Sequence, residues 1–142
     1  MTTPIVSALS PVSVAVLGIL KQDATLMGLT TGGWHEDVPP APVWPFGWYE
    51  VRERDVRGFG TGGLPEVELR THVFSQVSGL AQAQRINNIV VHLLKDASLT
   101  VEGYQQCGLV FSDESIPIAD SEINGVKCHE LVSFFRIYVE QL

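Results

Sequence analysis

A change of hydrophobic period in the middle of the chain limits the fold more than any other feature. Residues 66–76, EVELRTHVFSQ, alternate apolar and polar side chains, which is the pattern of a strand with one buried face. Residues 79–96, GLAQAQRINNIVVHLLKD, then carry apolar side chains at helical spacing, with Ser78 placed to cap the helix. Because such a helix must bury its apolar stripe, the sequence predicts a helix packed on a sheet.

Elements on the N-terminal side extend this pattern. Residues 10–23 predict a helix, with Ser10 as its N-cap and Pro11 at its first helical position. Residues 24–33 predict a short turn that ends at a double glycine. Residues 47–57 then alternate as a strand, and its partner is the strand at 66–76. The glycine-rich residues 58–65 form the tip of the predicted long hairpin.

The second half of the chain predicts more strands. Residues 99–105 and 106–114 read either as two strands or as one strand bent around Gly103 and Gly108. Residues 115–126 are expected to form a loop, and residues 127–141 a long final strand.

Length and composition indicate a single domain. The 142 residues, 45% hydrophobic and 18% charged, suffice for one core spanning residues 1–142. The order of elements predicts the α+β class. We expect a mainly antiparallel sheet of about four to five strands, with an N-terminal helix and one long central helix packed on it.

Residues 31–50, TGGWHEDVPPAPVWPFGWYE, hold all three tryptophans and four of the eight prolines. The prolines predict an extended segment, because each lacks an N–H and biases the residue before it away from helix. Packing of the rings on a core or at an interface is favoured over an aromatic cage for a ligand. Trp44 and Phe46 could therefore lie within one subunit or between two.

The charge balance argues against nucleic-acid binding. The net charge is -7, and only nine Lys and Arg residues are scattered along the chain. The apolar run at residues 12–20 has no basic residue before Lys21 and is too short to span a bilayer, so neither a signal peptide nor a membrane segment is expected.

Cysteine and glycine patterns offer no strong site. Cys107 and Cys128 lack metal-site spacing and are expected as small buried hydrophobes, with a cross-strand disulfide as the less favoured alternative. Gly58, Gly60 and Gly63 match a dinucleotide-binding pattern, but a strand rather than a helix follows them. We expect a hairpin tip there and no bound cofactor.

Candidate catalytic and metal groups are equally weak. Cys128 and His129 are neighbours on a strand, so their side chains should point to opposite faces and could not meet. His72 and His129 are expected on the solvent face, without a nearby carboxylate pair for acid–base chemistry. Four acidic residues cluster in the expected late loop, where a solvated loop is favoured over a weak cation site: Asp113, Glu114, Asp120 and Glu122.

In the order and spacing of these segments, the chain resembles the tail-terminator (tail-completion) proteins of long-tailed bacteriophages. The resemblance rests on the N-terminal helix, on VPPAPVWPFGWYEV leading into the first long strand, and on VELRTHVFSQVSGLAQAQRINNIVVHLLKD. It ends with the final strand, CHELVSFFRIYVEQ.

This resemblance implies a structural, non-enzymatic virion protein without cofactor or metal, assembled in the host cytoplasm. It implies a hexameric ring that caps the tail tube, ends its polymerisation and joins the head through a neck protein, while DNA passes through without sequence-specific binding. Strand edges and apolar loop tips would supply the subunit contacts. The candidate contact residues are Trp44, Phe46, Phe59 and Leu64.

Two other functions remain open from the sequence. The first is another neck component, such as a head-completion protein. The second is a small cytosolic enzyme or ligand-binding α+β domain that uses the aromatic residues at 34–49 and the glycines at 58–63.

Overall fold

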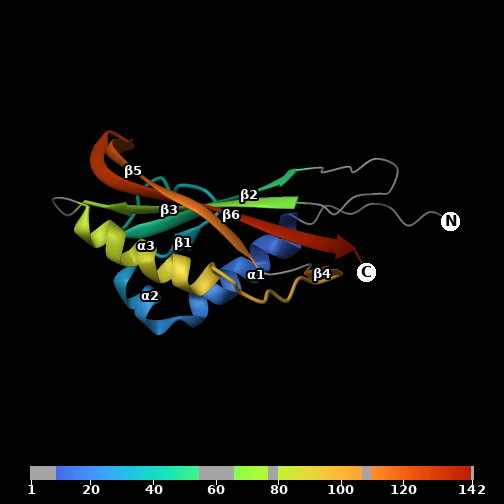
Figure 1. Ribbon diagram of the computed structural model, residues 1–142. Helices are drawn as coiled ribbons and strands as arrows, with labels where there is room; N and C mark the ends of the chain where they lie inside the picture. The colour runs from blue at the N-terminus through green and yellow to red at the C-terminus, as the bar shows by residue number, and fades with distance from the viewer. Residues whose placement is uncertain (1–8, 55–65, 77–79, 107–109, 142) are drawn as a thin grey trace.

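The computed structural model describes residues 9–54, 66–76, 80–106 and 110–141. These residues form an α+β fold, as predicted, with the helices gathered on one face of a twisted sheet (Figure 1). The elements follow the order α1 (Leu9–Gln22), α2 (Ala24–Leu29), β1 (Trp34–His35), β2 (Phe46–Arg54), β3 (Glu66–Ser75), α3 (Ala81–Leu94), β4 (Tyr104–Gln106), β5 (Phe111–Ile123) and β6 (Val126–Gln141).

The sheet is mixed and has six strands in the described part of the chain, so the prediction of a mainly antiparallel sheet of four to five strands needs correction. Its order is β1-β2-β3-β6-β4, and β5 also pairs with β6. β1 pairs with β2 in parallel, whereas the other pairs are antiparallel. β1 and β4 have two and three residues, too few to show a period in the sequence.

The β2–β3 hairpin confirms the central prediction. Its register runs from Phe46 opposite Phe74 to Arg54 opposite Glu66. β2 begins at Phe46, one residue before the predicted start, and the predicted tip at 58–65 lies outside the described residues.

The prediction of a loop at residues 115–126 is wrong, because β5 continues to Ile123 and a two-residue turn joins it to β6. Asn124 and Gly125 have φ values of 52° and 80°, and Ile123 pairs with Val126 across them. Asn-Gly favours this backbone, since both central residues of a type I′ turn need positive φ. β4 and β5 pair with different parts of β6, so a single bent strand is also excluded.

The central helix is shorter than the sequence suggested. α3 has 14 residues, the same number as α1, and therefore is not the one long central helix expected at 79–96. It begins after Leu80, which makes no side-chain cap hydrogen bond, while Ser78 lies outside the described residues. α1 begins at Leu9, so Ser10 lies in its first turn rather than at the N-cap. No described helix is long and apolar enough to cross a membrane.

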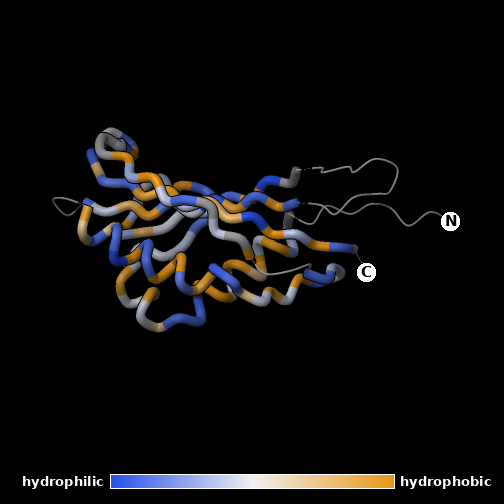
Figure 2. Tube along the Cα trace, viewed as in Figure 1, coloured by the Kyte–Doolittle hydropathy of each residue, from blue (hydrophilic) through white to orange (hydrophobic). Residues whose placement is uncertain are grey.

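The main core lies between the helices and one face of the sheet. α1 packs against β1 and β2, whereas α3 packs against β3 and β6. Hydrophobic and hydrophilic residues alternate along α3, and its apolar residues are buried there (Figure 2). The core includes these fully buried side chains: Val12, Val16, Leu20, Leu69, Ile86, Val90, Phe135 and Ile137.

A triangle of polar side chains lies where α3 meets β5 and β6. Ser133 Oγ on β6 donates to Asn87 Oδ1 at 2.6 Å, and Asn87 Nδ2 donates to Ser115 Oγ of β5 at 3.2 Å. The two serine hydroxyl oxygens lie 2.8 Å apart. Asn87 and Ser133 are 4% and 1% exposed, so these bonds satisfy groups that water reaches poorly.

Candidate assembly face

The candidate functional surface is the sheet face opposite the helices, here called the outer face. Strand alternation brings polar and aromatic side chains of three adjacent strands together on it. Register pairs Trp48 with His72 and Glu50 with Arg70 between β2 and β3. β6 adds Cys128 and Glu130 on the same face, beside β3.

The proline-containing segment between β1 and β2 covers one end of the outer face. Phe46, Phe74 and Cys128 form a second apolar cluster there, separate from the main core. The rings of Phe46 and Phe74 stack with centroids 4.9 Å apart. Trp44 meets Phe46 edge-on at 5.0 Å, and Val38 of the same segment packs on this cluster too. The predicted pair Trp44 and Phe46 is therefore brought together inside one chain.

Hydrogen bonds fasten this segment to strands on both sides. Trp48 Nε1 donates to the carbonyl of Glu36 at 2.7 Å. Asn124 Nδ2, in the β5–β6 turn, donates to the carbonyl of Pro40 at 2.7 Å. The segment thus reaches from β2 to the β5–β6 turn across the end of the sheet.

Trp34 serves the other side of the sheet. It is 6% exposed in the main core, at β1, and its ring lies directly over Gly47 of β2. The three tryptophans consequently do not converge on one point, and the arrangement differs from an aromatic cage.

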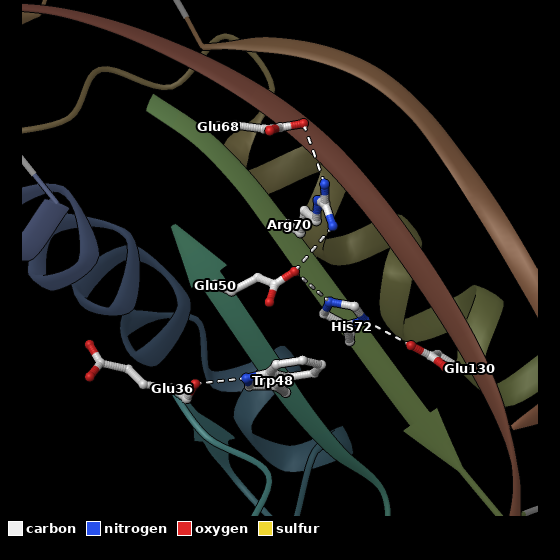
Figure 3. Close-up of polar contacts among 7 residues, drawn as sticks. All are labelled: Glu36, Trp48, Glu50, Glu68, Arg70, His72 and Glu130. Atoms are coloured by element: carbon white, nitrogen blue, oxygen red, sulfur yellow. Dashed lines mark hydrogen bonds and ion pairs between the residues drawn. The ribbon is translucent and has the colours of Figure 1, made fainter. Parts of the chain in front are cut away.

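A buried histidine occupies the middle of the outer face (Figure 3). His72 Nδ1 lies 2.7 Å from Glu130 Oε1, and His72 Nε2 lies 3.6 Å from Glu50 Oε1. Its ring stacks on Trp48 with centroids 4.2 Å apart. The expectation of a solvent-face histidine without nearby carboxylates is wrong for His72, which is 8% exposed.

Glu130 is held by two donors. His72 binds one carboxylate oxygen, and Ser121 Oγ of β5 donates to the other at 2.6 Å. Burial tends to raise the pKa of Glu130, but these hydrogen bonds and the His72 charge outweigh burial and lower that pKa below its ordinary value. The carboxylate therefore joins β3, β5 and β6.

Cys128 is a free and buried thiol beside this group, as expected for a small hydrophobe. Burial, followed by the nearby charge of Glu130, raises the pKa of Cys128. A raised pKa disfavours the thiolate, which is the reactive form. Cys107 lies outside the described residues.

The other end of the outer face is charged and more open. Arg70 lies 3.5 Å from Glu50 and 4.0 Å from Glu68 (Figure 3). Its guanidinium sits 5.4 Å from the centre of the Phe134 ring. A cavity of about 230 Å³ is lined there by Glu50, Val51, Arg52, Glu68 and Arg70. Ligand pockets usually measure about 300 Å³ or more, so this hollow fits a single side chain better.

The remaining candidates are placed as follows. Phe59 and Leu64 lie outside the described residues, as do the three glycines of the dinucleotide-like pattern. The four acidic residues expected in a late loop lie on β5 instead. Within the described part of the chain, no group of three or more His, Cys, Asp or Glu residues could hold a metal ion.

Sequence reasoning missed the contact between His72 and Glu130. These residues are 58 positions apart and become neighbours only through the β3–β6 register, which pairs Phe74 with Glu130 and His72 with Val132. A carboxylate in a predicted strand that could pair beside His72 was the available signal.

Comparisons with known proteins agree with this architecture. The structure of a chain from the virion of a native gene transfer agent particle matches with a TM-score of 0.74 and 20% identity, covering 97% of this chain and 99% of that one. The structure of bacteriophage SPP1 gp17 protein matches with a TM-score of 0.58 and 18% identity, covering 92% and 90%. At these identities the likeness concerns the fold. A search of curated proteins found no significant match.

The comparison with protein-family models identifies a family as well as a fold. The model of the tail completion protein gp17 family matches residues 14–126, from α1 to the first residue of β6. This range contains the proline-containing segment, the β2–β3 hairpin and α3, on which the resemblance in the sequence rested. The chain therefore belongs to the tail completion protein gp17 family of bacteriophages and is a virion component.

Proposed function

We propose that this protein forms a ring that caps the tail tube, ends tube polymerisation and provides the surface that joins the tail to the head. The observation that carries this proposal is the family match over residues 14–126. The ring is a hexamer of this chain. Its other partners are the tail tube protein and a head–tail connector protein of the neck.

The chemistry of the outer face supports a structural, non-enzymatic role. His72, Glu50 and Arg70 form ion pairs within the face, which fixes its shape. The pKa of Cys128 is raised, whereas a nucleophilic cysteine needs a lowered one.

The charge of the chain suits a channel for DNA. A net charge of -7 repels a phosphate backbone, so DNA can pass without sequence-specific binding. Such passage requires that the ring does not hold the nucleic acid.

The four contact residues predicted from the sequence take different parts in this proposal. Trp44 is only half-buried and meets the neighbouring subunit or partner. Phe46 is fully buried within one chain, and its ring packs against the ring of Trp44. We further propose Phe59 and Leu64, which lie outside the described residues, as subunit contacts.

Electron microscopy of particles from a phage that lacks this protein tests the function. We expect overlong or unjoined tails, restored to normal by the wild-type protein supplied in trans. Accumulation of unstable filled heads instead would identify a head-completion protein and overturn the proposal.

Mass measurement of the purified protein tests the ring. Light scattering at micromolar concentration, alone and with the tail tube protein, should show a closed assembly in at least one condition. A particle that stays monomeric in both conditions and does not bind the tube protein contradicts the proposal.

A further inference from the structure

Five large apolar side chains are exposed among the described residues: Val14, Val43, Ile116, Ile118 and Val126. Two of them, Ile116 and Ile118, stand on β5 and are each 40% exposed. Their partners in the register are Val132 and Glu130, so both isoleucines lie on the outer face. The most exposed one is Val14 of α1, at 69%.

Among the described strands, β5 has a neighbour on one side only, where it pairs with β6. Its free edge is poorly suited to adding another strand, because Pro117 lies within it and the register shifts twice, between Ser112 and Ser115 and between Ile118 and Ser121. Proline and bulges are devices that prevent edge-to-edge pairing. A partner would therefore contact the side chains of β5.

The two exposed surfaces carry residues of opposite charge. On β5, Glu114 is exposed and lies two residues before Ile116, so it shares the outer side with the isoleucines. Glu122 pairs with Lys127 and lies on the other side of the strand. α1 has one charged residue, Lys21, which is also exposed. Val14 and Lys21 are seven positions apart, so they lie on the same side of α1.

The two surfaces also lie at opposite ends of the sheet. α1 packs against β1 and β2, whereas β5 lies beyond β6 at the other end of the strand order. Two different complementary surfaces on opposite sides produce a head-to-tail contact, which can close into a ring. A contact between two copies of β5 would instead bring like charges together.

We propose that the outer face of β5 around Ile116 and Ile118 docks onto α1 around Val14 and Lys21 of a second copy of this chain. This assignment rests on the proposed ring and names the two surfaces that form it. The isoleucines and Val14 supply the apolar centre, while Lys21 faces Glu114 of β5.

Cross-linking between two single-cysteine chains tests this contact. Val14→Cys and Ile118→Cys chains, each with Cys107→Ser and Cys128→Ala so that a single cysteine remains, are tagged differently, mixed and treated with a short bismaleimide. We expect a cross-linked pair that contains one chain of each kind. Arg85→Cys on the exposed side of α3, mixed with Ile118→Cys, serves as the control and should give no such pair. The control chain carries the same two background substitutions.

The outcomes separate this inference from the proposed ring. If rings of wild-type protein form but the Val14→Cys and Ile118→Cys chains do not cross-link, the named surfaces are wrong and the ring stands. Equal cross-linking by the Arg85→Cys control, or by Ile118→Cys chains alone, also overturns the inference. A wild-type protein that never assembles, even with the tube protein, and gives no mixed pair overturns both.

Charge reversal provides a second measurement. Lys21→Glu and Glu114→Lys should each raise the concentration for half-assembly about two- to fivefold, as expected for exposed ion pairs. Combining the two reversals should restore the wild-type concentration. Glu102→Lys, at an exposed position outside both surfaces, should not rescue Lys21→Glu. Rescue by Glu102→Lys, or no rescue by Glu114→Lys, contradicts the contact.

Discussion

At the residue scale, Gly47 shows how one missing side chain permits the packing of another. A Cβ built on Gly47 would lie 2.3 Å from the indole ring of Trp34, well inside contact distance. Trp34 can therefore enter the main core only because β2 has no side chain at this position. Gly47 is therefore required for packing and not for its backbone conformation.

Gly47→Ala should destabilise the fold by about 1–3 kcal/mol, because Trp34 or the strand must move. Gly28→Ala is the matched control, since a Cβ there meets nothing within 4 Å in helix α2. That change should stabilise the protein by up to about 1 kcal/mol. Urea unfolding of both variants measures the difference, and equal stability of the two would refute the packing argument.

The lowered pKa of Glu130 predicts how the stability of the fold changes in acid. Because the pKa of Glu130 is lowered in the folded state, the ionised carboxylate stabilises the fold above its unfolded-state pKa of about 4.3. This contribution is lost as the pH falls through the lower, folded-state pKa. Glu130→Gln should thus be less stable than wild type at pH 7 by about 1–2 kcal/mol, and the gap should narrow below about pH 4.

Urea unfolding from pH 7 to pH 3 measures this difference in stability between Glu130→Gln and the wild type. Glu122→Gln, at an exposed position on β5, should stay within about 0.5 kcal/mol of wild type at pH 7. If the stability difference between Glu130→Gln and the wild type were the same at every pH, the charge of Glu130 would not be its cause.

At the scale of the elements, the sequence was informative where a period was long. β3, α3 and β6 carry ten or more residues each in a regular pattern, and they were predicted to within a few residues. β5 was missed because its polar residues and Pro117 hide the strand pattern, although Asn124-Gly125 marked the hairpin turn. The His72–Glu130 contact was out of reach because it depends on a register between distant strands.

The polar triangle ties three of these elements together and yields a prediction. Asn87→Ala leaves the buried hydroxyl of Ser133 without its amide acceptor and removes the hydrogen bond to the exposed Ser115, which should cost about 1–3 kcal/mol. Asn88→Ala is the matched control, since Asn88 is exposed on the same helix. It should change stability by less than about 0.5 kcal/mol. Thermal unfolding compares the two, and similar losses for both would mean that the triangle contributes nothing.

At the scale of the whole molecule, β6 is the strand on which the sheet depends. It pairs with β3 on one side and with both β5 and β4 on the other. Its side chains also close the main core, where Phe135, Ile137 and Val139 are fully buried. The proposed β5 surface is therefore present only when β6 is in place.

Hydrogen exchange should reveal this hierarchy. Amides in the centres of β3 and β6 should exchange most slowly, because both strands have neighbours on each side. The short strands β1 and β4 should exchange fastest among the strands. Exchange followed by mass spectrometry of peptides measures these rates, and β6 exchanging as fast as β4 would contradict this view of the sheet.

The position of β6 in the chain also sets an order in time. β3, β4 and β5 are synthesised before β6. Until β6 is made, these three strands lack the strand with which each of them pairs. A nascent chain that has not yet produced β6 cannot hold β5 in place for a second copy. In the proposed ring, subunits would thus be protected from joining one another until translation has passed residue 141, so synthesis of each subunit would precede its assembly.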